Sequence, residues 1–226
     1  MKGAPFLLDK ILDFIYPNSC ILCGRMLNEY DVKKQEFTCN NCKKKLEYYL
    51  EDSCVKRISN KYFDYLLCTY KYNSLIRKIL LDFKFYNKKY LRLFLSSKII
   101  KVLKSINYKK YDYVVPVPIS FARYLERGYN QSSLVAFDIS KSLGIPMFRF
   151  CLIKIKNNKR QSELLAHERY NNTKGVYRIL NSKLVSQKRI ILIDDIYTTG
   201  NTANECSRVL KEAGASEVLV VVVARA

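Results

Sequence analysis

RIILIDDIYTTGNT, residues 189–202, is the stretch that decides the fold of this chain of 226 residues. Its first part, Ile190–Ile193, is a continuous apolar run, which is typical of a strand buried on both faces of a parallel sheet. Two acids and a hydroxyl-rich loop with one glycine follow, so the loop lies beyond the carboxyl end of the strand, where open α/β sheets bind ligands. The stretch therefore predicts an α/β fold, a parallel sheet flanked by helices, with a ligand site after residue 193.

A helix is predicted directly after this loop. Its apolar face and its glycine stop are formed by Ala203, Cys206, Val209, Leu210, Ala213 and Gly214. The spacing Thr202-x-x-Glu205 predicts a capping box at its start. The helix N-terminus then points at the loop, where its free N–H groups and the hydroxyls of Thr198, Thr199 and Thr202 form an anion cup, and Gly200 allows close backbone approach.

The two acids of the stretch, Asp194 and Asp195, require a different partner from the cup. Carboxylates repel a phosphate, so they accept hydrogen bonds from neutral hydroxyls or hold a metal. A sugar phosphate with vicinal hydroxyls satisfies both halves of the motif. The alternative is a strand that ends in ordinary capping acids and binds no ligand.

Four cysteines near the N-terminus have the spacing of a metal site. Cys20-x2-Cys23 and Cys39-x2-Cys42 are separated by fifteen residues. Two such pairs supply the tetrahedral four-sulfur shell that Zn2+ prefers, and because this shell has no open position the zinc is structural. The remaining cysteines, Cys54, Cys68, Cys151 and Cys206, are interpreted as small buried hydrophobes, Cys54 and Cys68 alternatively as remnants of a second site.

Positive charge is concentrated in the middle of the chain. The formal net charge is +20, and residues 67–180 carry 23 basic and 6 acidic residues. Residues 67–110 hold 12 basic residues and one acid, with aromatic residues between them that include Tyr70, Tyr72, Phe83, Phe85, Tyr86, Tyr90 and Phe94. This pattern favours single-stranded nucleic acid, whose phosphates attract cations and whose bases stack on rings. Two alternatives stay open: two helices whose apolar stripes carry these rings, and a genome-wide bias toward lysine.

Further motifs give the chain a family resemblance. The strand, two acids and Thr-Gly-x-Thr loop resemble the ribose-phosphate signature of type I phosphoribosyltransferases. VVPVP at 114–118, RGYNQ at 127–131 and the residues Gln161, Leu164, Arg169, Asn172, Gly175 and Tyr177 resemble the ComF family, also called ComFC or GntX-like. That family joins an N-terminal zinc finger to a phosphoribosyltransferase-type domain and is implicated in natural transformation.

The resemblance implies a site for phosphoribosyl pyrophosphate (PRPP) with Mg2+. Asp194 and Asp195 would bind the ribose hydroxyls, and Thr198, Thr199, Gly200, Asn201 and Thr202 the 5′-phosphate. Arg127, with Arg123 as a weaker candidate, would bind the pyrophosphate, and Asn130 and Gln131, which open the helix behind it, would also contact PRPP. Asp194, Asp195 and Arg127 would be the catalytic residues. The basic run 154–160 would form a flap that closes over the site, or else a solvated loop. In related purine-salvage enzymes an aspartate at the position of Thr198 serves as the general base, and this chain has no carboxylate there. Glu163, His167 and Glu168 are titratable residues near the flap.

Two hypotheses follow for the function. The first is an Mg-dependent phosphoribosyltransferase that acts in DNA uptake and handles incoming single-stranded DNA, with an unknown acceptor for which nucleic acid is one candidate. The second is a PRPP-sensing protein that binds single-stranded DNA during uptake, together with uptake proteins such as a ComF-type helicase and DNA-processing factors. A phosphoribosyltransferase of nucleotide metabolism is a further alternative.

The expected organisation has three parts. Residues 1–60 form an N-terminal helix and the zinc domain, 61–110 a basic linking hairpin and two helices, and 111–226 the phosphoribosyltransferase-type domain. Strands are predicted near 112–117, 147–153, 189–193 and 217–223, and helices near 130–143 and 202–213. No apolar run reaches the roughly 18 residues of a membrane span. We therefore expect a cytoplasmic protein without membrane insertion or disulfides.

Overall fold

The computed structural model describes residues 19–28, 37–49, 54–156 and 175–226. The chain divides into two compact units, Met1–Glu47 and Tyr48–Ala226. Several predicted features lie outside the described residues: the helix at the N-terminus, the part of the flap from residue 157 onward, and Gln161, Glu163, Leu164, His167, Glu168, Arg169 and Asn172.

The first unit is built around two short turns. An antiparallel bridge joins Ser19 to Met26, and the turn between them is closed by the Gly24 N–H, which donates to the Cys20 carbonyl at 2.8 Å. Gly24 has φ +73°, a conformation that glycine adopts without steric cost. The second turn leads into the short helix α3 (Asn40–Lys43), with Cys39 at its N-cap.

The second unit contains a five-stranded sheet that is parallel except at one edge. Its order is β1 (Val55–Arg57), β2 (Tyr65–Lys71), β7 (Glu217–Arg225), β6 (Arg189–Tyr197) and β3 (Tyr113–Pro116). Only β1 runs antiparallel to its neighbour. The predicted α/β class with a mostly parallel sheet is confirmed.

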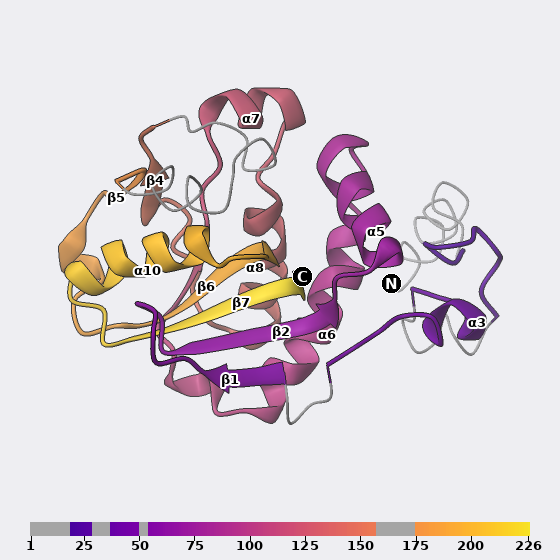
Figure 1. Cartoon of the computed structure of the whole chain (residues 1–226), viewed down its shortest axis with the longest axis horizontal. Helices are drawn as coiled ribbons and strands as arrows, with labels where there is room; N and C mark the ends of the chain where they lie inside the picture. Colours follow the sequence, from indigo (N-terminus) through magenta and orange to yellow (C-terminus); the bar gives the residue numbers. More distant parts are fainter. Residues whose placement is uncertain (1–18, 29–36, 50–53, 157–174) are drawn as a thin grey trace, which may run out of the picture. The chain divides into compact units, whose positions relative to one another are not determined.

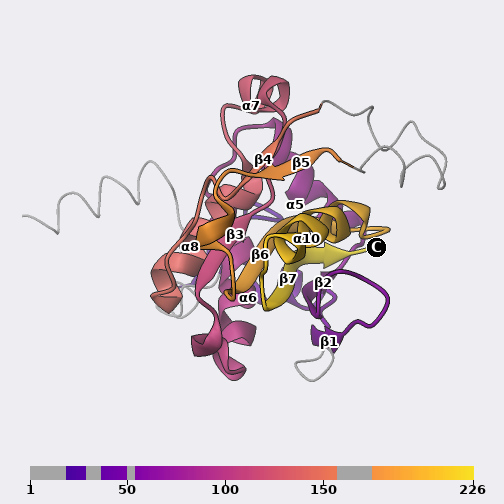
Figure 2. The same cartoon turned by 90° about the vertical axis from the view of Figure 1, so that its left-hand side faces the viewer.

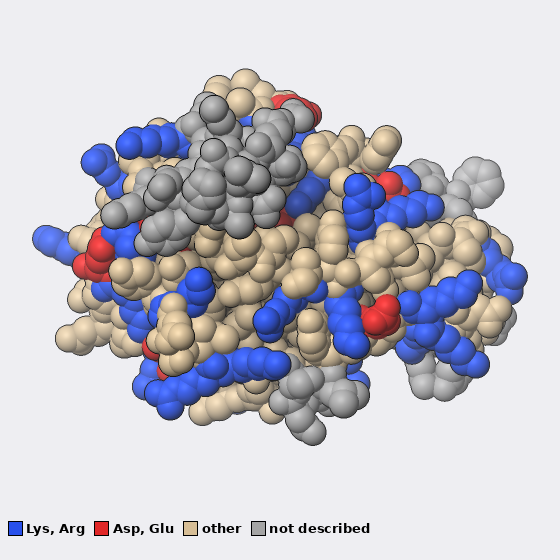
Figure 3. All heavy atoms as spheres, in the orientation of Figure 1, with Lys and Arg blue, Asp and Glu red and all other residues tan. Residues whose placement is uncertain are grey.

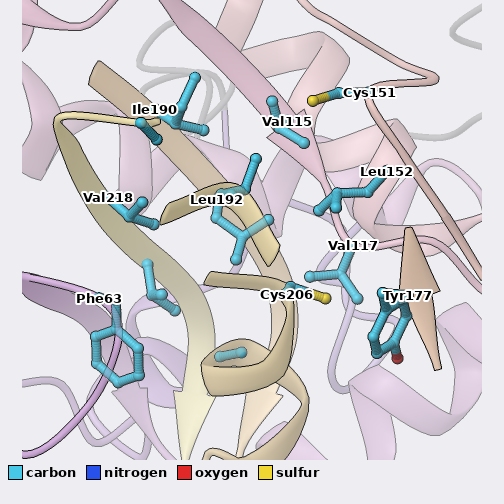
Figure 4. Packing of buried hydrophobic residues seen from close by; sticks show 14 of the residues in the cluster. Phe63, Val115, Val117, Cys151, Leu152, Tyr177, Ile190, Leu192, Cys206 and Val218 are labelled. Atoms are coloured by element: carbon cyan, nitrogen blue, oxygen red, sulfur yellow. The ribbon is translucent and has the colours of Figure 1, made fainter. Parts of the chain in front are cut away.

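Helices cover both faces of this sheet (Figures 1 and 2). They are α5 (Ser74–Phe85), α6 (Leu91–Ser105), α7 (Phe121–Arg127), α8 (Gln131–Leu143) and α10 (Asn201–Glu212), with 3-10 turns η1 (Tyr108–Lys110) and η3 (Ser182–Leu184). α6 and α8 contact each other on one face, and α10 contacts β6 and β7 on the other. Ile190 and Leu192 of β6 join Cys206 of α10 in one core cluster (Figure 4). Ile191 and Ile193 point to the opposite face of the sheet. They are equally buried because helices cover that face as well.

The segment 61–110 is built into this same sheet. It supplies β2, which lies between β1 and β7, and the helices α5 and α6. The stripes of both helices are buried, among them Ile76, Leu80 and Phe83 on α5 and Phe94 and Leu95 on α6. The boundaries expected at residues 60 and 110 stay a prediction.

The prediction of a strand of the main sheet near 147–153 is wrong. Met147 makes only an isolated parallel bridge to Val114, and the chain turns at Arg149 and Phe150. Phe150 is 66% exposed, so the run loses its buried face there. β4 (Leu152–Lys154) instead pairs antiparallel with β5 (Tyr177–Ile179) in a separate two-stranded sheet.

Across the described part of the chain, no helix combines the length and apolarity needed to span a bilayer.

Candidate functional site

The two acids lie in the C-terminal half of β6, which continues to Tyr197 where the sequence predicted a strand that ends at residue 193. Asp194 still pairs with Val222 of β7, and its carboxylate Oδ1 accepts the Asp195 N–H at 2.9 Å. The Ser132 hydroxyl of α8 lies 3.5 Å from the same oxygen. Both carboxylates line a cavity of about 380 Å3.

The environment of Asp194 disfavours its charged form. Burial and then the neighbouring Asp195 carboxylate raise the pKa of Asp194 to about 7, although the Asp195 N–H, Lys84 and Ser132 act in the opposite direction. Asp194 therefore keeps its proton to a higher pH in the folded protein than in an unfolded chain.

An Asp194→Asn variant tests this. The native state binds more protons than the unfolded state between pH 4 and 7, so wild-type stability falls relative to the variant as pH rises through this window. A shift from 3.8 to about 7 corresponds to roughly 4 kcal/mol, which solvent screening at a partly exposed group reduces to about 2 kcal/mol above pH 7. Urea denaturation of both proteins at pH 4.5, 6 and 8 measures the difference. A difference that does not change with pH would contradict the assignment.

A lysine that sequence reasoning did not assign to the site pairs with the second acid. Lys84 Nζ of α5 forms an ion pair with Asp195 Oδ2, and both side chains are largely buried. The available signal was weak: Lys84 stands four residues after Leu80 and so borders the apolar stripe of α5. The helix that we expected to bind nucleic acid thus supplies a wall of the cavity.

The loop after β6 forms a small recess at the N-terminus of α10. It is lined by Asp194 and by residues 196–203, including all five predicted phosphate-binding residues. α10 has neither a side-chain cap nor an acid in its first turn, so the positive end of its dipole is not neutralised from within. Thr198 and Thr202 also line the larger cavity.

Gly200 is the residue that shapes this recess. It is the N-cap of α10 and has φ +75°. A Cβ at this position would lie 2.5 Å from the Tyr197 ring, which is far inside van der Waals contact. Glycine therefore lets the loop fold back against the strand.

The predicted capping box is wrong. Because Gly200 caps the helix, Thr202 lies inside its first turn. Glu205 instead accepts the Gly175 N–H at 2.7 Å and pairs with Arg208. The side chain of Glu205 thus ties α10 to the start of the segment that leads into β5.

Four cationic side chains line the same cavity as the acids. They come from different elements: Lys84 from α5, Arg123 and Arg127 from α7, and Lys154 from β4. Burial, followed by repulsion from Arg123, lowers the pKa of Lys154 to about 8. Lys154 therefore belongs to the cavity wall, whereas the rest of the proposed flap from residue 157 lies outside the described residues.

Arg127 and Gln131 have polar atoms with no partner. Arg127 donates to Gln131 Oε1 at 3.1 Å and its guanidinium lies over the Phe85 ring, 4.9 Å from the centroid. Within the described part of the chain, Arg127 Nε and Gln131 Nε2 are buried without a hydrogen bond, and Gln131 is only 2% exposed. Such atoms cost about 1–3 kcal/mol each, so these two residues of the cavity wall are held in place at a cost in stability.

Asn130 has a positioning role in the structure. Its Oδ1 accepts the Ser132 N–H at 3.0 Å and caps α8, while its Nδ2 donates to the Val117 carbonyl at 3.0 Å. The side chain thereby fixes α8 against the loop after β3. Its predicted contact with PRPP stays a prediction, as do those of the other site residues.

The four cysteines meet in the first unit. The sulfur atoms of Cys20, Cys23, Cys39 and Cys42 all lie within 4.8 Å of one another, and the Cys23 and Cys39 sulfurs are 3.8 Å apart. A zinc ion at about 2.3 Å from four sulfurs spaces them roughly 3.8 Å apart. The residues therefore fit a structural zinc ion.

Cys54 and Cys68 lie outside this cluster. Both are buried, and their thiols donate to the carbonyls of Tyr49 at 3.3 Å and Tyr70 at 3.4 Å. They are packed in the second unit as small buried side chains.

Comparison with protein families agrees with both parts of this description. The Phosphoribosyl transferase domain family matches residues 130–226, and the Double zinc ribbon domain family matches residues 11–68. Together with the parallel sheet and the cysteine cluster, these matches define the chain as a phosphoribosyltransferase-fold protein with an N-terminal zinc ribbon.

Known relatives cover most of the chain. Competence protein F of Haemophilus influenzae is 29% identical over 83% of this chain and 84% of its own length. Competence protein ComFC of Streptococcus pneumoniae is 28% identical over 88% of this chain and 96% of its own. Among solved structures, adenine phosphoribosyltransferase from Leishmania tarentolae is 16% identical with a TM-score of 0.41, over 73% of this chain and 77% of that one. The chain is thus a homologue of the ComF and ComFC proteins, and the resemblance to the ComF family is confirmed.

Proposed function

We propose that the cavity binds PRPP with Mg2+. One observation carries this proposal: two acids, two threonines of the loop at the α10 N-terminus, and four cations line one cavity of about 380 Å3. The acids suit the ribose hydroxyls, the loop at α10 suits the 5′-phosphate, and the cations suit the pyrophosphate.

The donor set is compatible with a magnesium ion. Mg2+ prefers oxygen ligands, keeps several waters and is commonly held by one or two carboxylates plus substrate phosphates. Asp194 and Asp195 are the described carboxylates at this cavity. The ion would neutralise charge on the pyrophosphate oxygens.

The residues of the chain would assist departure of pyrophosphate from the anomeric carbon. Arg127 and Lys154 would stabilise the negative charge that develops on the leaving oxygen, an electrostatic contribution that needs no general base. Position 198 is a threonine, so no carboxylate there takes a proton from the acceptor. The protein is accordingly proposed to be a phosphoribosyltransferase that relies on stabilisation of the departing pyrophosphate and not on a carboxylate base at position 198.

Calorimetric titration of the full chain with PRPP and Mg2+ tests the binding. We expect one PRPP per chain, and release of pyrophosphate in the presence of an acceptor. Binding without release would favour the PRPP-sensing alternative, and absence of heat with an intact fold would contradict the proposal.

We further propose a role in DNA uptake, in which the protein handles incoming single-stranded DNA. The relatives are named competence proteins, and basic side chains outnumber acidic ones on the face shown in Figure 3. Of the seven aromatic residues noted in 67–110, Tyr70, Phe83 and Phe94 are buried, whereas Phe85, Tyr86 and Tyr90 are 52%, 69% and 43% exposed. Phe85 is the last residue of α5 and Tyr86 follows it directly, so these two exposed rings stand at the C-terminal end of a basic helix, where a base can stack on a ring.

Single-strand binding should therefore depend on salt and on Tyr86. The logarithm of the association constant for a single-stranded oligonucleotide should fall linearly with the logarithm of the salt concentration. The slope should be about −0.7 for each neutralised phosphate. Tyr86→Ala should weaken binding about fivefold or more, since one base–ring stack is worth about 1–3 kcal/mol. Fluorescence anisotropy measures both. Phe150→Ala, an equally exposed ring outside the segment, serves as control; equal losses in both variants, or no binding at low salt, would contradict this role.

A further inference from the structure

A second cavity of about 480 Å3 adjoins the first. It lies between α5, α7 and the end of β6, and it shares Lys84, Arg123, Arg127 and Ile196 with the first cavity. The acids and the loop that define the PRPP site are absent from its described lining. The two cavities are thus separated by cationic side chains.

The charge of the second cavity is positive. Among its described lining residues, Arg77, Lys84, Arg123 and Arg127 face a single acid, Glu126. Lys84 is already paired with Asp195, but the three arginines leave an excess of positive charge. Burial, followed by repulsion from Arg123, lowers the pKa of Arg127. An anion placed between these guanidinium groups would relieve that repulsion.

The uncharged part of the described lining is apolar and aromatic. It consists of Tyr72, Leu80, Leu81, Phe85 and Ile196. Phe85 already stacks against the Arg127 guanidinium, so a flat ring entering beside it would meet both an aromatic face and a cation. Phe85 is 52% exposed, so about half of its surface is open to a ligand in addition to its contact with Arg127.

We propose that this second cavity binds an aromatic ring that carries an anionic group, a phosphate or a carboxylate. The ring lies against Phe85 and Tyr72, and the anionic group is held by Arg77 and Arg123. This ligand approaches the first cavity past Lys84 and Arg127. The site deepens the proposed function, because a ligand held here is placed to serve as the acceptor, but its binding does not require PRPP.

Phenyl phosphate is the minimal probe, since it has the ring and the anion but no ribose. Calorimetry with the full chain should show that it binds at least tenfold more tightly than inorganic phosphate or phenol. Arg77→Gln should weaken binding about tenfold. Lys78→Gln removes the same charge from the neighbouring exposed position of α5, outside the described lining, and should leave binding unchanged. Phe85→Leu should weaken binding, whereas Tyr86→Leu should not.

The outcomes separate this site from the PRPP site. Retention of Arg77-dependent binding when PRPP and Mg2+ are present supports a distinct cavity. Equal effects of Arg77→Gln and Lys78→Gln, or no effect of either, overturn the proposal, as does displacement of the probe by PRPP without any role for Arg77. If PRPP gives no heat while the probe binds through Arg77, the proposed function fails and this inference stands.

A nucleoside monophosphate and a pyridine carboxylate then distinguish the two sources of the ligand. Whichever binds more tightly and depends on Arg77 has the chemistry of the natural ligand. Failure of phenyl phosphate and of both these compounds to bind would overturn the proposal.

Discussion

Replacement of both Asp194 and Asp195 by asparagine should weaken PRPP binding at least a hundredfold. Each carboxylate is proposed to accept a hydrogen bond from a ribose hydroxyl, and a hydrogen bond to a charged group contributes about 1.5–3 kcal/mol. Asparagine keeps the side-chain size and leaves an oxygen that accepts the Asp195 N–H, so the end of β6 keeps its shape. The loss then reports on charge and not on collapse of the cavity.

The measurement is calorimetry with PRPP and Mg2+. Asp138→Asn is the matched control, because Asp138 on α8 is also a partly buried acid, with Ser96 and Arg92 at 3.5 and 3.6 Å from its carboxylate. Asp138 is not part of the described lining of either cavity, so this variant should bind PRPP like the wild type. Unchanged affinity of the double variant would remove the acids from the site.

Loss of zinc should unfold the first unit and leave the second intact. Zinc binding to small cysteine sites supplies about 10–16 kcal/mol, and the short elements described in this unit provide little apolar burial of their own. Cys39→Ser removes one of four ligands from a closed shell. Metal analysis should then find well below one zinc per chain, and hydrogen exchange of residues 19–28 and 37–47 should become fast.

The control for this experiment is Cys54→Ala, a change at a cysteine outside the cluster. It should keep one zinc per chain and slow exchange in the same residues. Exchange in β6 and β7 should be unchanged in Cys39→Ser, because the sheet belongs to the other compact unit. Slow exchange around Cys20 in zinc-free protein would contradict a structural metal.

Local sequence patterns predicted those parts of the molecule in which neighbouring residues act together. The apolar run 190–193, the two acids and the loop at 198–202 are contiguous, so their arrangement follows from one strand and one helix. The cysteine pairs are likewise local, and their spacing predicts the cluster that the structure contains. The capping box failed because Gly200, in a left-handed conformation against Tyr197, already caps α10.

The prediction of a main-sheet strand near 147–153 also failed because local sequence does not specify tertiary neighbours. The apolar composition of this segment suits a strand, but strand pairing depends on what lies alongside. β2 pairs with β7 through contacts between residues about 150 positions apart, such as Leu67 with Val221. No pattern within either segment announces that pairing.

The sequence alone therefore determined the α/β class, the acidic loop with its helix and the four-cysteine zinc site, since each depends on residues close together in the chain. Only the tertiary structure decided that Lys84 pairs with Asp195, that Arg127 and Gln131 come together in the cavity wall, and that a second cationic cavity lies beside the first. These features join side chains from α5, α7, α8 and β6. Their distances are determined by how the helices pack on the sheet, which periodicity and spacing along the chain do not specify.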